Sequence, residues 1–307
     1  MSTLYRSGSP TRAPAAPALL LALVAVAAFG LTLPLTRVAV SAFGAFEVTA
    51  ARAAIAGVIA GVLLLVERAP LPSAAAWRQL VVIALGSVIG FPLFAALAMG
   101  RAPVSHGAVV IALVPLLTAV IGSRLAAERL PRRFWAASLF GTLAVGVFAL
   151  RGARAGIATA DLFLVGAVVC AAVGYAYGGR LSRSLPASHV IYWALVLCLP
   201  LSLAATVLAA RPVVSPVHAG VWVAMAYLAL VSQLGGFVIW NRALAVGGVA
   251  RTSQTQLLQP FVSLTGAAWL ADEVIHADAV VFAGVVALSL AVGRSRPRAA
   301  LGHAVTP

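Results

Sequence analysis

Charge is scarce in this sequence. Only 9% of the 307 residues are charged, lysine is absent, and 7 acidic residues stand against 21 arginines, which gives a formal net charge of +14. Soluble domains carry charge on about a quarter of their residues, so the composition excludes an ordinary soluble domain. A strongly basic balance can indicate a nucleic-acid partner, but these arginines lie singly between apolar segments. We therefore expect no nucleic-acid binding.

Reactive and metal-binding patterns are also missing. Cys170 and Cys198 are the only cysteines, and both fall in apolar stretches, so no disulfide framework is predicted. No group of His, Cys, Asp and Glu has the spacing of a metal site. No Ser-His-acid set, glycine-rich phosphate loop or ATP-hydrolysing segment occurs. We therefore expect no catalytic residues, no cofactor, no metal ion and no ATP-driven transport from this chain.

Apolar residues are abundant, at 63% of the chain, and the mean hydropathy is +1.07. A helix needs about 20 such residues to cross a bilayer core of about 30 Å. The apolar stretches lack the alternation of a transmembrane barrel. They predict an all-α integral membrane protein with ten transmembrane helices, at 18–40, 45–66, 78–99, 104–124, 133–150, 160–180, 189–209, 219–239, 251–270 and 277–293.

A long stretch occurs twice. Each copy begins with Ala-Leu-Ala and a glycine, and each then carries an apolar run that contains a single proline. The spacing from Pro115 to Glu128 in the first copy equals the spacing from Pro260 to Glu273 in the second. The copies are offset by nearly half of the chain, which indicates two homologous halves. The predicted domains are a disordered tail at 1–17, repeats at 18–150 and 160–293, and a second tail at 294–307.

Five helices per half is an odd number, so the second half would enter the membrane in the opposite sense. The prediction is therefore a pair of inverted five-helix repeats, an arrangement found in transporters. With the N-terminus inside, only five arginines fall in outside segments, namely Arg37, Arg101, Arg151, Arg154 and Arg211. Fifteen fall inside and Arg52 lies within a span. This bias follows the positive-inside rule and predicts that both termini are cytoplasmic.

A polar stripe opens the ninth predicted helix. Thr252, Gln256, Gln259 and Ser263 are spaced by four, three and four positions, so they share one helical face. Polar side chains in a bilayer usually face a cavity or a partner helix. The stripe thus predicts either substrate contacts or interhelical hydrogen bonds of about 0.6 kcal/mol each. Gln233 and Tyr175 are the next candidates for substrate binding.

Other residues have predicted structural or gating roles. An arginine inside a span costs about 2.5–3.5 kcal/mol, and for Arg52 we favour a structural role, through a carbonyl of the first span or by snorkelling, over substrate contact. Pro115 and Pro260 should kink matching helices, and the kinks either shape a central cavity or aid packing. Trp240 and Arg242 near a span end are interpreted as interfacial anchors. The motif residues Glu128 and Glu273 complete this group.

Energy coupling has few candidates. Proton antiport would require Glu47, near the outer end of its span, or His106 to titrate. Facilitated diffusion and exchange are equally compatible with the sequence. Two Gly-x-x-x-Gly pairs, Gly57 with Gly61 and Gly86 with Gly90, predict close contacts between helices.

These features together resemble the EamA-type permeases of the drug/metabolite transporter superfamily. The resemblance rests on two five-helix halves with a mid-helix proline and an equally spaced glutamate, on Gln259-Pro260, and on Trp240-Asn241-Arg242-Ala243-Leu244. Arg52 matches an arginine common in the second helix of the family. The family's frequent Gly-Glu is Ala127-Glu128 and Asp272-Glu273 here. The resemblance implies a carrier of the bacterial cytoplasmic membrane, often an exporter of amino acids or other small metabolites.

The expected function is therefore a secondary transporter that moves a small polar or amphipathic metabolite by alternating access. It would be a multi-pass protein of the lipid bilayer, either monomeric or homodimeric, and not an enzyme. The alternative is a membrane sensor or scaffold subunit that keeps the fold without transporting anything. Members of one fold differ in what they bind, so the substrate does not follow from the resemblance.

Overall fold

The computed structural model describes residues 15–125, 132–151, 155–209 and 217–294. Every regular element within these ranges is a helix, in agreement with the all-α prediction. The first helix begins at Ala15, inside the segment predicted as a tail. Glu128, residues 1–14 and residues 295–307 lie outside the described residues.

The elements follow the duplication in chain order. The first half contains α1 (Ala15–Gly30), α2 (Thr32–Ala42), α3 (Ala45–Val66), α4 (Ala74–Ile83), the π-helical η1 (Ala84–Gly90), α5 (Phe91–Met99), α6 (Val104–Ile111), α7 (Val114–Leu125) and α8 (Arg132–Arg151). The second half contains α9 (Ala155–Leu181), α10 (Ala187–Ala209), α11 (Ala219–Ala226), the π-helical η2 (Tyr227–Gly235), α12 (Gly236–Gly247), α13 (Val249–Thr252), the 3-10 helix η3 (Ser253–Leu258), α14 (Gln259–Leu270) and α15 (Ala277–Arg294).

Seven helical segments of the described chain are long and apolar enough to cross a membrane. They are Ala16–Ala42, Ala45–Val66, Ala74–Met99, Val104–Leu125, Thr159–Leu181, Ala187–Ala209 and Ala219–Gly247. Shorter apolar helices occupy Trp135–Val145 and Ala277–Ser289. The predicted ninth span is divided among α13, η3 and α14. The chain is therefore a multi-pass membrane protein.

The duplication extends to irregularities of the backbone. Each half contains one long helix that is interrupted by a π-helical segment, η1 in Ala74–Met99 and η2 in Ala219–Gly247. The helix after it is broken in both halves, and α7 and α14 resume at equivalent positions of the two copies, Val114 and Gln259. Isolated π-helical turns are rare and often lie at functional sites. Their recurrence at equivalent places supports two structurally related halves.

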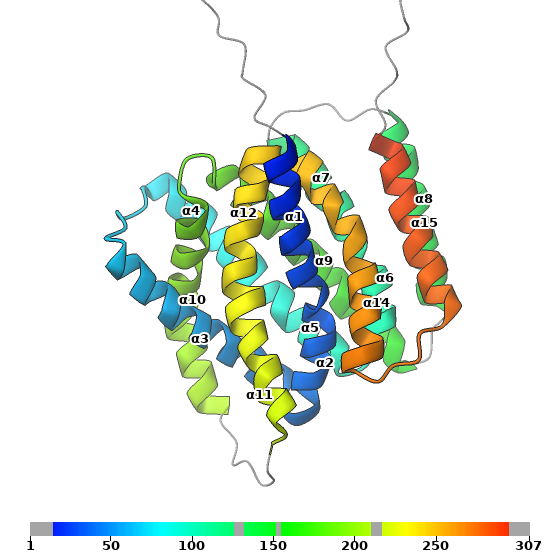
Figure 1. Cartoon of the computed structure of the whole chain (residues 1–307), viewed down its shortest axis with the longest axis horizontal. Coiled ribbons are helices and arrows are strands. Elements are labelled where there is room, and N and C mark those ends of the chain that lie inside the picture. Colours follow the sequence, from blue (N-terminus) through cyan, green and yellow to red (C-terminus); the bar gives the residue numbers. More distant parts are fainter. Residues whose placement is uncertain (1–14, 126–131, 152–154, 210–216, 295–307) are drawn as a thin grey trace, which may run out of the picture.

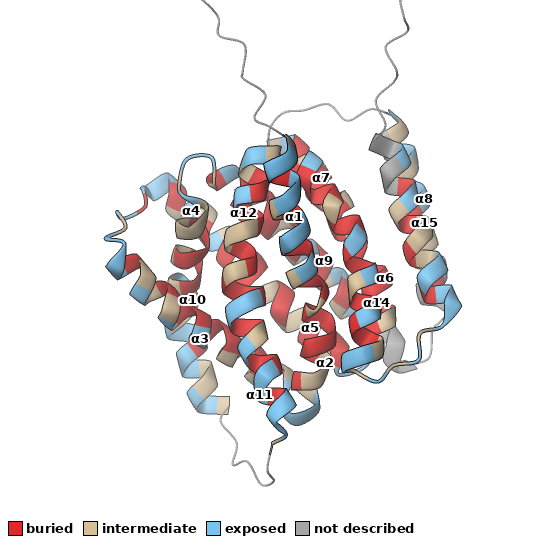
Figure 2. Cartoon of the chain, in the orientation of Figure 1, coloured by how far each residue is buried: buried red, intermediate tan, exposed pale blue. Residues whose placement is uncertain are grey.

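Helices of the two halves pack against each other throughout the bundle. α3 lies along α10, α1 along α12, α5 along α9, and α8 along α15 at one edge of the molecule (Figure 1). α1 begins and α15 ends at the same end of the bundle. Figure 2 shows buried residues on the inner faces and exposed residues on the outer faces. Many of the exposed residues are large and apolar, as expected for surfaces that face lipid.

Candidate functional site

Eight polar side chains are buried together at the junction of the two halves. We call this group the central polar cluster, and each member has at most 5% of its surface exposed. The first half contributes residues from α2, α3 and η1, and the second contributes residues from α9, η2, η3 and α14. The members are Thr32, Arg52, Ser87, Tyr175, Ser232, Gln233, Gln256 and Gln259.

Arg52 joins the halves through a hydroxyl pair. Its Nη2 donates to Ser232 Oγ at 3.1 Å, and Ser232 Oγ lies 2.9 Å from Thr32 Oγ1. Arg52 is 2% exposed, so its guanidinium does not snorkel to the interface. The expected partner, a carbonyl of the first span, is replaced by the side chain of Ser232 in η2.

A second chain of polar contacts continues from Tyr175. The side chain of Gln256 lies beside the Tyr175 hydroxyl, and its Nε2 donates to Gln259 Oε1 at 3.3 Å. Gln233 Nε2 donates to the Ser87 carbonyl, also at 3.3 Å, and so connects η2 with η1. Residues that are distant in sequence and belong to both halves thus form one polar region.

Several buried atoms of the cluster have no hydrogen-bond partner. They include Arg52 Nε, Ser87 Oγ, Gln233 Oε1 and Gln256 Oε1. Leaving a buried polar group unpaired costs about 1–3 kcal/mol. Polar groups of this kind can be satisfied by a polar ligand or by water, so the cluster can bind a small molecule that carries donors and acceptors.

The structure divides the predicted polar stripe. All four residues are buried, but Thr252 Oγ1 donates to the Ala243 carbonyl at 3.4 Å, and Ser263 Oγ donates to the Gly30 carbonyl at 2.7 Å. These two therefore make interhelical hydrogen bonds, whereas Gln256 and Gln259 join the cluster. The 3-10 turns of η3, with about three residues per turn, break the regular helical face.

A proline explains the Ser263 contact. Pro34 lacks an N–H, so it cannot donate to the carbonyl of Gly30, one helical turn earlier. α1 ends at that glycine, and Ser263 supplies the missing donor. α14 can approach α2 closely because Gly266 has no side chain. A Cβ atom at this position would lie only 2.8 Å from the Pro34 ring. The helix break is therefore stabilised by the other half of the molecule.

Pro115 and Pro260 lie at matching breaks. Each is the second residue of a helix, α7 and α14, and each follows a segment whose α-helical geometry has been interrupted. Because proline has no N–H, neither residue can donate to the carbonyl four positions earlier, and the Gln256 carbonyl instead accepts from the Gln259 amide at the end of η3. Whether the two breaks shape a substrate cavity stays a prediction.

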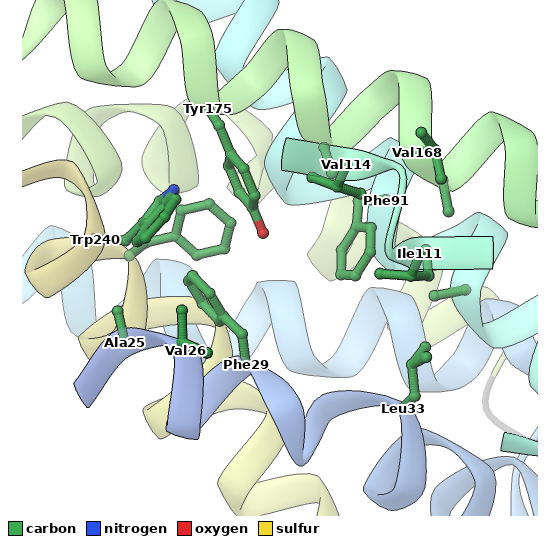
Figure 3. Close-up of a cluster of buried hydrophobic side chains, with 14 of the residues drawn as sticks. Ala25, Val26, Phe29, Leu33, Phe91, Ile111, Val114, Val168, Tyr175 and Trp240 are labelled. Carbon is green, nitrogen blue, oxygen red and sulfur yellow. The ribbon is translucent and has the colours of Figure 1, made fainter. Parts of the chain in front are cut away.

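An aromatic group packs beside the cluster and includes Tyr175. Its ring centroid lies 6.0 Å from that of Phe29 and 5.6 Å from that of Trp240, and Phe237 completes the group (Figure 3). Trp240 is 0% exposed, so the interfacial-anchor interpretation was wrong for this residue. Arg242 in α12 is exposed, and for this residue the anchor interpretation stays a prediction. The aromatic rings form an apolar wall beside the polar region.

The coupling candidate His106 has a half-buried acidic partner. Its Nε2 lies 2.6 Å from Asp161 Oδ1, and its ring stacks on Phe148 at 5.2 Å. The pair connects α6 of the first half with α9 of the second. Asp161 was not identified from the sequence, although the predicted span 160–180 contains it. The other candidate, Glu47, lies in the first turn of α3.

Glu273 binds the start of α6 across the two halves. Its Oε1 accepts a hydrogen bond from the Val104 amide at 2.6 Å, and its Oε2 accepts one from the Ser105 amide at 3.1 Å. The first amides of a helix have no partner within the helix and carry partial positive charge. A carboxylate there accepts hydrogen bonds from both amides and complements their charge, so Glu273 caps α6 from the other half. Whether it also has a gating role stays a prediction.

Replacing Glu273 with glutamine is expected to lower the free energy of unfolding by about 1 kcal/mol, because the amide keeps one acceptor and loses the charge. Thermal unfolding in detergent measures the change. Asp272→Asn is the matched control, since Asp272 is exposed and asparagine also accepts its φ of 51°. Equal losses in the two variants would contradict the capping role.

A cavity of about 310 Å³ opens at the end of the bundle where α1 begins. It lies between α7 of the first half and α9, α12 and α13 of the second. Gly247 in its lining packs near Ala18 of α1, and Ala176 in its lining is the neighbour of Tyr175. The lining residues are Gly122, Leu125, Ala176, Arg180, Arg183, Gly247, Gly248, Val249, Ala250 and Arg251. The cavity thus lies at that end of the bundle and is lined by both halves.

Comparisons with known proteins agree with this architecture. The EamA-like transporter family matches at residues 16–150 and 158–293, one copy in each half. The protein named Uncharacterized transporter YdeK, from Bacillus subtilis (strain 168), is 42% identical over 253 residues, covering 82% of this chain and 87% of that protein. A solved structure described only as a crystal structure of a protein aligns with a TM-score of 0.65 at 22% identity, over 91% of this chain and 96% of that chain. At that identity the solved structure supports the fold alone.

Proposed function

This chain belongs to the EamA-like transporter family, and from that premise we propose that it is a secondary transporter of a small polar or amphipathic metabolite, such as an amino acid, which it exports by alternating access. The substrate would bind between the halves, and their relative rocking would expose it to each side in turn. The observation that carries the proposal is the central polar cluster, which both halves build and which contains unpaired buried atoms.

We further propose ten transmembrane helices in two inverted five-helix repeats, at 18–150 and 160–293. The backbone breaks before α7 and α14, at equivalent positions of the two copies, support the repeats. An even number of spans agrees with α1 beginning and α15 ending at one end of the bundle (Figure 1). The arginine distribution favours a cytoplasmic location for both termini in a bacterial inner membrane.

Within the cluster, we assign substrate contact to Gln256, Gln259, Gln233 and Tyr175. Their amide and hydroxyl groups can donate and accept hydrogen bonds, and some of the amide oxygens have no partner. Thr252 and Ser263 instead position their helices through backbone carbonyls. This arrangement suits a small solute with several polar groups beside an apolar part that faces the aromatic wall.

Transport by purified protein in liposomes tests the proposal. Counterflow of radiolabelled amino acids, nucleosides, sugars and polyamines is expected for one of these classes. Replacing Gln256 and Gln259 with leucine should reduce that flux more than tenfold, because the substrate loses its hydrogen-bond partners. Thr265→Val, at an exposed position of α14, is the control and should retain flux.

The alternative is a non-transporting sensor or scaffold subunit. In that case no class shows counterflow, and the double leucine variant behaves like the control. Such a result, obtained with protein that remains folded in the liposomes, would overturn the transport proposal.

For energy coupling we propose the pair of His106 and Asp161. The pair spans the two halves, so relative movement of the halves would break and remake this contact between two groups that can each carry a proton. Glu273 lies at the same end of α6, where it is bound to the amides of Val104 and Ser105. Exchange driven by substrate alone would not require a proton to move.

His106→Gln is expected to abolish the stimulation of flux by an imposed pH gradient and to leave substrate exchange within about twofold of the original rate. His189→Gln is the matched control, because His189 forms a similar pair with Glu67 at 2.8 Å on the surface. Glu47→Gln is measured in parallel. If the pH stimulation survives in the His106 variant and disappears in the Glu47 variant, the coupling group is Glu47.

A further inference from the structure

Arg52 is a buried cation without an acidic partner in the described chain. A guanidinium remains protonated in proteins. Both ion pairs observed in the described residues are formed by histidines, at His106 and His189, and neither involves Arg52. Among the described residues, the one side chain that accepts a hydrogen bond from Arg52 is the neutral hydroxyl of Ser232. An isolated buried charge is unfavourable, so this site favours a ligand that brings a negative charge.

One edge of the guanidinium is arranged for a planar anion. Its Nε has no hydrogen-bond partner, and its Nη2 is held by Ser232. These two nitrogens form the edge that binds a carboxylate with two parallel hydrogen bonds. The Ser232 hydroxyl is also within 2.9 Å of Thr32, so it is already oriented beside that edge. Nη2 carries two N–H groups, so the unpaired Nε and one N–H of Nη2 can together donate to the two oxygens of a carboxylate.

The surrounding groups complete a site for a small carboxylic acid. Tyr175 lies near enough to Arg52 for an electrostatic interaction, and Gln256 lies beside Tyr175. Both are neutral, so the site has a single positive charge to balance one negative charge. A phosphate monoester, with close to two negative charges, would leave one uncompensated in a low-dielectric interior. The site therefore suits a monoanionic carboxylate better than a phosphate.

Charges at the nearby cavity are favourable for an anion. Arg180 in the last turn of α9 and Arg183 just beyond it line the cavity at the end of the bundle where α1 begins, and both are exposed. Positive charges at the mouth of a cleft raise the local concentration of anions. An acidic compound would thus be attracted to the end of the bundle at which this cavity opens.

We propose that Arg52 binds a carboxylate of the transported compound, so that the substrate class is a small carboxylic acid or a zwitterion with a free carboxylate. This inference rests on the proposed transport function and assigns its substrate chemistry. Arg52 is then a substrate-binding residue and does not serve only to join helices.

Matched pairs of compounds test the proposal. Purified protein is titrated with L-leucine, L-threonine, L-phenylalanine and butyrate, and with the amide of each, while thermal unfolding is recorded. At least one acid is expected to raise the melting temperature, and its amide is expected to bind at least tenfold more weakly. Arg52→Gln should remove this difference between acid and amide. Arg37→Gln is the matched control, because Arg37 donates to the Met99 carbonyl and should leave the difference intact.

Several outcomes would overturn the proposal: an amide that binds as tightly as its acid, an acid preference that persists in Arg52→Gln, or no binding by any acid. Inorganic phosphate that binds in an Arg52-dependent manner, in preference to the acids, would also overturn it. If the Arg52 variant does not fold, the proposal is tested by comparing acid and amide binding in the original protein and in Ser232→Ala. The Ser232 variant should weaken binding of the acid more than binding of the amide.

Liposome flux separates the two proposals. Acids that bind at Arg52 without flux would refute transport alone, and equal flux of acids and amides would refute the carboxylate site alone.

Discussion

Truncation of Trp240 to alanine is expected to lower the free energy of unfolding by about 3–5 kcal/mol, the usual cost of removing a large aromatic side chain from a core. Trp240 is 0% exposed and contacts aromatic rings from two other helices. Its ring centroid lies 6.2 Å from that of Phe29 in α1 and 5.6 Å from that of Tyr175 in α9. In a bilayer the loss arises mainly from packing, because lipid is as apolar as the protein interior. Unfolding in detergent, followed by temperature or by added denaturing detergent, measures the change.

Trp269→Ala is the matched control for this prediction. Trp269 is 82% exposed on α14, so the same truncation leaves no internal cavity and should cost well under about 1 kcal/mol. Trp240→Ala should also weaken substrate binding, because Tyr175 in the central polar cluster would lose part of its support. Similar losses in the two variants would favour the interfacial-anchor interpretation that the structure contradicts.

The fold was predictable because its signals are local and repeated. The hydropathy of the chain located helical segments, and the spacing of Pro115 and Pro260 located the duplication. The irregular segments η1, η2 and η3 were not predictable in this way. Their geometry depends on packing against the other half, as when Ser263 donates to the carbonyl that Pro34 leaves without a donor. The hydropathy of a segment gives no information about contacts of this kind between distant residues.

The candidate site was predictable in part. Buried polar side chains on a membrane helix are conspicuous in sequence, so Gln256 and Gln259 were identified. Arg52 was noticed, but its contact with Ser232 joins residues 180 positions apart, and no periodicity connects them. Gln254, which is also buried and has both polar side-chain atoms unpaired, was missed because an α-helical face was assumed across the 3-10 turns of η3.

Gly86→Ala is expected to lower the free energy of unfolding by about 1–3 kcal/mol and to reduce transport, because one added methyl group meets backbone that cannot move aside. The methyl carbon would lie 2.7 Å from the Cys170 carbonyl oxygen and 3.2 Å from the Gly174 amide nitrogen. Relief requires η1 and α9 to separate. These elements carry Ser87 and Tyr175, so the separation would widen the central polar cluster. Thermal unfolding and liposome flux measure the two effects.

Gly61→Ala makes the same chemical change in the other Gly-x-x-x-Gly pair and is the matched control. Its nearest neighbour would be a methyl group of Val196 at 3.7 Å, an ordinary van der Waals contact, so both stability and flux should be retained. The sequence pattern alone treats the two glycines alike, whereas the structure distinguishes contact with rigid backbone from contact with a side chain. If Gly86→Ala is as stable as Gly61→Ala, η1 and α9 do not pack as closely as the distances indicate, and the cluster that they position must be wider than the structure shows.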